Sequence, residues 1–124
     1  MNAERYRPLD FPSGSAARVL AAIIAGSETM AAYLIFTRDK TTDAAELATY
    51  SGLAGPSMAG HAVTPHVVYG KHEVLEGPEV EGVVVVSFPT VEEARAWYDS
   101  PAYTAARAHR FKGADYRVVL VQGV

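Results

Sequence analysis

The stretch WYDSPAYTAARAHR, residues 97–110, brings together an aspartate, a serine and a histidine, the residue types of a nucleophilic catalytic triad. On a continuous helix His109 would lie about 13 Å along the axis from Ser100, because each residue adds about 1.5 Å. A serine nucleophile and its base must approach to about 3 Å, so a helix here excludes the pair. Ser100 instead precedes Pro101, an order typical of a helix N-cap followed by the first helical residue.

Five side chains are candidates for the wall of a ligand pocket: Tyr50, Tyr69, Trp97, Tyr103 and Arg107. Trp97 shares the i, i+3, i+4 spacing of a packed helix face with Ala94 and Tyr98, so it is either a core residue or part of a cavity between helices and sheet. Tyr50 on the first expected helix and Tyr69 on the second expected strand could meet across the interior, as packing residues or as hydrogen-bond donors to a ligand. The arginine would be solvated or paired with a glutamate. Alternatively, it or Arg110 would meet an anionic ligand.

His66 and Glu76 are the candidates for acid–base catalysis. His66 flanks an apolar run, and histidine is the side chain that titrates near neutral pH. Glu76 stands before a Gly-Pro pair, so it is either a buried acid near a pocket or a turn residue. We predict that one of these two side chains is the base if the protein is an enzyme.

The sequence gives no indication of a metal or cofactor site. The histidines at 61, 66 and 72 are spaced H-x4-H-x5-H, and the last two would lie about 20 Å apart on an extended chain. No H-E-x-x-H, G-x-G-x-x-G, P-loop or G-x-S-x-G motif occurs. The chain has no cysteine, which excludes disulfides, thiolate chemistry and cysteine-based zinc sites. We therefore expect neither a metal nor a cofactor.

Composition and charge point to one small globular domain. The chain has 124 residues, of which 49% are hydrophobic and 20% charged. Its net charge is −3 and it has no run of basic residues, so a nucleic-acid partner is not expected. The apolar run VLAAIIAG, residues 19–26, is too short to span a bilayer and makes a poor signal peptide. We expect a cytoplasmic protein without a membrane partner.

Two regions differ in pattern. Residues 1–29 are polar and rich in turn-forming residues, and we expect an N-terminal extension ahead of a folded domain at 30–124. A flexible extension, a helix packed on the domain or a partner, and a targeting segment are the alternatives for it. Within 30–124, strand-like runs occupy 31–38, 66–70, 82–88 and 116–123. Helical patterns occupy 43–55, 90–100 and 100–113, with Asp43, Thr90 and Ser100 as N-caps.

The order of these elements, β-α-β-β-α-β, predicts an α+β fold of the ferredoxin-like type with an antiparallel sheet. The run VVVVSF, residues 83–88, has no polar residue before Ser87, so its strand needs burial on both faces. Helices of the same chain can cover one face of the sheet. A second copy would cover the other, so we expect a homodimer.

The segment VLEGPEVEGVVVVSFPTVEEARAWYDSPAYTAARAHRFKGADYRVVLVQG, residues 74–123, resembles the domain-of-unknown-function 1330 family. The shared features are the EG after the second strand, the FPT…WYDSPAY block, the arginines that follow it and the closing VLVQG. With AYLIF in the first half, the resemblance covers residues 31–123. Many relatives carry a Gly-Gly pair and a basic residue before the second strand, where this chain has AGHAVTPH.

The resemblance implies a dimeric α+β barrel, in which two ferredoxin-like sheets face each other with helices outside. Related barrels include cofactor-free monooxygenases, haem-degrading enzymes, muconolactone-type isomerases and ligand-binding regulators, and fold analogy alone does not choose among them. We expect a homodimer that binds a small organic molecule in a cleft between sheet and helices, with a cofactor-independent isomerase or monooxygenase as the enzymatic extension. The alternative is a non-catalytic ligand sensor or a structural dimer.

Overall fold

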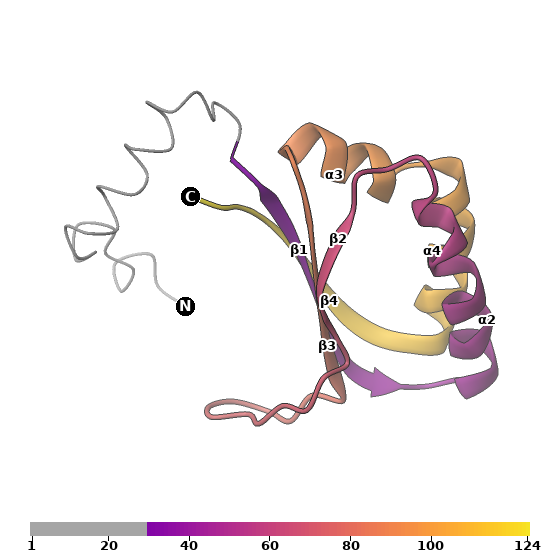
Figure 1. Cartoon of the computed structure of the whole chain (residues 1–124). Coiled ribbons are helices and arrows are strands. Elements are labelled where there is room, and N and C mark those ends of the chain that lie inside the picture. The colour runs from indigo at the N-terminus through magenta and orange to yellow at the C-terminus, as the bar shows by residue number, and fades with distance from the viewer. Residues whose placement is uncertain (1–29) are drawn as a thin grey trace.

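The computed structural model describes residues 30–124, which form a four-stranded antiparallel sheet with helices on one face (Figure 1). Along the chain the elements are β1 (Ala32–Thr41), α2 (Ala44–Ala54), the 3-10 turn η3 (Pro56–Met58), β2 (Thr64–Val68), β3 (Gly82–Phe88), α3 (Val91–Tyr98), α4 (Pro101–Gly113) and β4 (Ala114–Gln122). The strand order is β2-β3-β1-β4. The predicted ferredoxin-like β-α-β-β-α-β arrangement is confirmed. The extension expected at 1–29 lies outside the described residues.

The two faces of the sheet differ in what they contact. Alternate residues of β1, namely Ala32, Leu34 and Phe36, point to the helices and are buried. Their partners on β3 include Val86 and Phe88, which are also buried. The intervening residues of these strands point to the opposite face, which no helix covers in residues 30–124 (Figure 1). The VVVVSF run therefore contributes to a core on one face only.

Side-chain caps begin the helices where the sequence predicts. The Asp43 carboxylate accepts from the backbone N–H groups of Ala45 and Glu46 at 3.1 and 3.2 Å. The Ser100 hydroxyl accepts from the N–H of Tyr103 at 3.2 Å and donates to the carbonyl of Trp97 at 2.8 Å, so it joins α3 to α4. The carboxylate of Glu46 does not complete a capping box, because it bonds instead to His109 Nδ1 at 2.6 Å.

Strand β2 differs from the prediction, since it covers Thr64–Val68 rather than 66–70. Its register with β3 shifts between Pro65 and Val67, and Tyr69 leaves the strand with a φ of 54° in the left-handed region. Residues 71–81 then form an irregular loop, which Figure 1 shows projecting beyond the sheet on the side away from the helices. The second strand therefore ends at Val68, two residues before the predicted end at Gly70.

Helix α4 packs closely on the start of α2. A Cβ at Gly113 would lie 2.7 Å from the backbone N of Leu47, so a side chain there would force the two backbones apart. The carbonyl of Gly113 also accepts from the backbone N–H groups of Thr42 and Asp43 at 2.8 and 3.0 Å. This junction fixes α2 relative to α4. None of the helices described in residues 30–124 is long and apolar enough to cross a membrane.

The Ser100→Ala variant is expected to lose about 1 kcal/mol of stability, because two backbone groups at the α3–α4 junction lose their hydroxyl partner. Urea unfolding followed by circular dichroism measures the change. Thr104→Ala, an exposed position on α4, is the matched control and should stay close to wild type. A loss no larger than that of the control would contradict the cap assignment.

Candidate functional site

A cavity of about 500 Å³ lies between the sheet and the helix α2 with its following turn η3. Its floor is formed by side chains of β1 and β3 that face the helices, namely Phe36, Val84 and Val86. Met58 and Trp97 add apolar surface from the helix layer. The lining is largely apolar, as in most sites for small organic molecules.

The cavity opens beside the edge strand β2. Val68 and Tyr69, which line it there, are 62% and 42% exposed. On the opposite rim, Ser51 and Gly55 at the end of α2 are also exposed. A ligand could therefore enter between β2 and the end of α2 without displacing a buried element.

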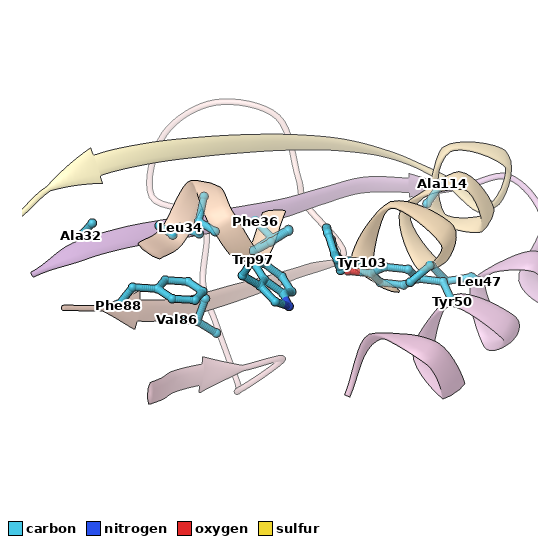
Figure 2. Close-up of a cluster of buried hydrophobic side chains, with 12 residues drawn as sticks. Ala32, Leu34, Phe36, Leu47, Tyr50, Val86, Phe88, Trp97, Tyr103 and Ala114 are labelled. Atoms are coloured by element: carbon cyan, nitrogen blue, oxygen red, sulfur yellow. Dashed lines mark hydrogen bonds between the residues drawn. The ribbon is translucent and has the colours of Figure 1, made fainter. Parts of the chain in front are cut away.

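A row of aromatic side chains crosses the core, and two of its members, Trp97 and Tyr50, line the cavity (Figure 2). Phe88, Trp97, Tyr103 and Tyr50 follow one another from the sheet to α2, with successive ring centroids 5.6, 4.0 and 6.1 Å apart. The indole N–H of Trp97 donates to the hydroxyl of Ser57 at 3.2 Å. The ring of Trp97 is thus held by contacts on several sides and forms a rigid part of the wall.

Two pairs of tyrosine hydroxyls provide the polar groups near the cavity. The hydroxyls of Tyr50 and Tyr103 lie 2.7 Å apart, and those of Tyr69 and Tyr116 lie 2.5 Å apart. In each pair the first tyrosine lines the cavity. Burial raises the pKa values of Tyr50, Tyr69 and Tyr103 above the ordinary tyrosine value, so these hydroxyls stay protonated at neutral pH.

Tyr69 is held in place by its neighbours. A Cβ at Gly82 would lie 2.4 Å from its ring, so the glycine leaves the space that the ring occupies. The guanidinium of Arg38 lies 4.8 Å from the ring centroid and pairs with Glu81 at 3.1 Å. Hydrogen bonds from Thr41 hold the pKa of the Glu81 carboxyl below its usual value, so Arg38 keeps a charged partner.

Arg110 is a buried cation next to the tyrosine pairs. It is 2% exposed, and its guanidinium lies 4.9 Å from the ring centroid of Tyr116 and 5.9 Å from that of Tyr50. One terminal nitrogen donates to the Tyr98 hydroxyl at 3.4 Å, and its Nε has no hydrogen-bond partner. Among residues 30–124, no carboxylate lies within ion-pair distance of it. Aromatic faces take the place of a counter-ion.

Three of the five predicted pocket residues line the cavity: Tyr50, Tyr69 and Trp97. Tyr103 is buried behind Tyr50 and reaches the site through its hydroxyl. Arg107 lies elsewhere, with its guanidinium 4.3 Å from the ring centroid of Tyr98 and 3.9 Å from Asp99. Of the two arginines considered from the sequence, Arg110 is the one in the interior. Its spacing from Tyr103 and Ala106 on one buried face of α4 was the signal for this.

The two acid–base candidates lie outside the cavity. His66 sits at the irregularity of β2, with Nε2 2.7 Å from the Ser87 hydroxyl and its ring 5.7 Å from that of Tyr33, whose strand position points away from the helices. Glu76 is exposed in the 71–81 loop and behaves as a turn residue rather than as a buried acid. Within residues 30–124, no three potential metal-binding side chains of His, Cys, Asp or Glu lie together.

Comparisons with known proteins identify a family and a fold. A family model described as "Domain of unknown function (DUF1330)" matches residues 31–124. No curated protein matches the chain. The chain is similar to a protein of unknown function from Rhodopseudomonas palustris whose crystal structure is known. The two sequences are 18% identical and the structures align with a TM-score of 0.61, over 82% of this chain and 92% of the other.

Two further structures share the fold. A dimeric ferredoxin-like protein of unknown function from Thermobifida fusca is 17% identical with a TM-score of 0.57, and covers 77% of this chain and 92% of its own. A protein from Caulobacter crescentus described as a "putative antibiotic biosynthesis monooxygenase" is 15% identical with a TM-score of 0.54, over the same shares of the two chains. At these identities the likeness shows the fold alone.

The buried tyrosines predict a loss of stability at high pH. Their folded-state pKa values lie above the unfolded value of about 10, so their contribution is complete below about pH 10 and is lost as pH rises towards the folded values. The double variant Tyr50→Phe/Tyr103→Phe should therefore lose less stability than wild type between about pH 9 and about pH 11.5. Urea unfolding across this range measures it, and equal losses in both proteins would contradict the assignment.

Proposed function

We propose that this chain, which belongs to the DUF1330 family, is a homodimeric α+β barrel protein that binds a small organic molecule between its sheet and helices. The observation that carries the proposal is the cavity of about 500 Å³, which is open at one edge and lined by apolar and aromatic side chains. A purely structural domain would gain stability by filling this space, because close packing is what interiors favour. The open cavity therefore favours a ligand-binding role over a structural one.

The uncovered face of the sheet supports the dimer. A row of apolar residues crosses all four strands on this face: Val67, Val85, Ile35 and Val119. Val119 and its neighbour Val121 on β4 are 46% and 44% exposed. An apolar sheet face of this kind is typically buried against a second layer. The related Thermobifida fusca structure is described as dimeric, and a second copy placed on this face would form the barrel.

A cofactor-independent isomerase or monooxygenase is the enzymatic form of the proposal. The fold likeness to the Caulobacter crescentus protein agrees with it, and tyrosine hydroxyls beside an apolar cavity could orient a substrate oxygen. His66 lies on the uncovered sheet face, so a base role for it would require a substrate between the two sheets of the dimer. An exposed Glu76 would act only if the 71–81 loop were covered by the second copy.

A non-catalytic ligand sensor uses the same cavity without a base. Neither His66 nor Glu76 is among the residues that line the cavity, which supports binding more than catalysis. Turnover of a bound compound would distinguish the enzyme from the sensor. Neither form calls for a metal or an organic cofactor.

Light scattering of the wild-type protein is expected to give a molar mass twice that of one chain. Val119→Lys should yield monomers, because it places a charge in the apolar row that the second copy would bury. Val124→Lys, at an exposed position at the chain end, should remain dimeric. A monomeric wild-type protein would overturn the dimer, and a dimeric Val119→Lys protein would place the interface elsewhere.

Native mass spectrometry of freshly purified protein is expected to show a retained small molecule. Ala54→Phe fills the cavity from its α2 side, so this variant should lose the added mass while keeping its fold. Ala48→Phe adds the same ring on the exposed face of α2 and should keep the ligand. If wild type and Ala48→Phe also fail to bind the neutral fluorescent probe N-phenyl-1-naphthylamine, or if Ala54→Phe binds it as well as they do, the cavity is not a binding site.

A further inference from the structure

We propose that the ligand of this cavity has an apolar body and a single anionic oxygen, which Arg110 stabilises through the hydroxyls of the two tyrosine pairs. This inference rests on the proposed binding function of the cavity. The anionic oxygen could belong to a carboxylate or to an ionised phenol or enol, which share the chemistry that the site would recognise.

Arg110 carries a buried positive charge. A guanidinium that is 2% exposed has lost nearly all of its hydration, and it remains charged because arginine does not deprotonate in proteins. A buried charge is normally paired with an opposite charge or a metal ligand. Among residues 30–124 no carboxylate is within ion-pair distance, and the Nε has no partner. The site therefore holds one positive charge that an anionic ligand could balance.

The second argument is the arrangement of the hydroxyls between Arg110 and the cavity. Each tyrosine pair has one member that lines the cavity, Tyr50 or Tyr69, and one member behind it, Tyr103 or Tyr116. Arg110 lies 4.9 Å from the ring centroid of Tyr116, and its positive charge also acts on the Tyr103 hydroxyl. Arg110 is thus the buried cation beside both pairs, although its own hydrogen bond goes to the Tyr98 hydroxyl.

The third argument is the direction of the hydrogen bonds. Arginine has only donors, whereas a tyrosine hydroxyl has one proton to donate and can accept another. A cation beside the inner hydroxyl of a pair favours the orientation in which that hydroxyl turns its oxygen to the cation and its proton towards the outer hydroxyl. The hydroxyl of Tyr50 or Tyr69 is then free to donate into the cavity. Such a chain presents donors to a ligand and favours an oxygen that carries negative charge.

The remaining lining of the cavity determines the polarity of the rest of the ligand. Apart from these hydroxyls and Ser51, its lining is apolar or aromatic, and no second cation lines it among the described residues. Arg107 and Arg38 already have the carboxylates of Asp99 and Glu81 as partners. The polar groups at the cavity therefore suit an apolar molecule with one anionic group at one end. They are too few for a dianion or a sugar.

Competition against bound N-phenyl-1-naphthylamine tests the inference with isosteric pairs. One pair is 2-naphthoate and 2-naphthamide, and the other is 2,4-dinitrophenolate and 2,4-dinitroaniline. Wild type should bind at least one anion about tenfold more tightly than its neutral partner, as expected for hydrogen bonds to a charged group. The pair that shows the preference separates a carboxylate ligand from a phenolate or enolate ligand.

Variants assign the preference to Arg110. Arg110→Gln should abolish it while the affinity for the neutral reporter stays within about twofold. Lys112→Gln removes a positive charge from an exposed position on the same helix and should keep the preference. If Arg110→Gln does not fold, the double variant Tyr50→Phe/Tyr69→Phe takes its place and should also lose the preference for the anion. It keeps Arg110 and both rings and removes only the hydroxyls at the cavity.

The outcomes separate this inference from the function on which it rests. Reporter binding with no preference for either anion in wild type would overturn the inference and leave the binding function standing. A preference that survives in Arg110→Gln, or in the double tyrosine variant, would also overturn it. A cavity that does not bind the reporter at all would overturn the proposed function, and this inference with it.

Discussion

The close packing of α4 on the start of α2 determines where the groups of the candidate site lie. Gly113 allows the two backbones to approach, and its carbonyl bonds the turn that begins α2. Because α2 rests mainly on α4, it brings Tyr50 to Tyr103 but leaves the space above β2 and β3 unfilled. The contact that completes the core at one end therefore also produces the cavity at the other. The aromatic row through Trp97 fills the core next to the cavity (Figure 2).

Burying the tyrosine hydroxyls and Arg110 in this core lowers the stability of the fold, so their presence needs an explanation. Burial disfavours ionisation of the tyrosines, and pairing their hydroxyls offsets the cost of removing them from water. Arg110 is the larger cost, since cation–π contacts with the rings around it replace only part of its hydration. A core under selection for stability alone would favour an apolar residue at this position. The proposed role in ligand binding gives a reason for a charge at this position.

Local patterns in the sequence were sufficient to predict the order of the helices and strands. Strand alternation and the caps at Asp43, Thr90 and Ser100 act within a few residues, so they can be read without the fold. The bounds of β2 could not be predicted, because its irregularity depends on pairing with β3 and its end on the left-handed Tyr69. Tyr50, Tyr69 and Trp97 were predicted for the pocket from their type. Which hydroxyls pair depends on contacts between elements distant in sequence. The inward position of Arg110, by contrast, follows the local spacing of Tyr103, Ala106 and Arg110 on one face of α4.

The cavity is proposed to bind an apolar molecule whose anionic oxygen is stabilised from Arg110 through the tyrosine hydroxyls. A crystal structure of the protein with 2-naphthoate would show the bound pose. We expect the naphthalene ring to lie against Trp97 and Met58, with a carboxylate oxygen within hydrogen-bond distance of the Tyr50 or Tyr69 hydroxyl. A carboxylate that points out of the mouth between β2 and α2, or a ligand bound outside the cavity, would contradict it.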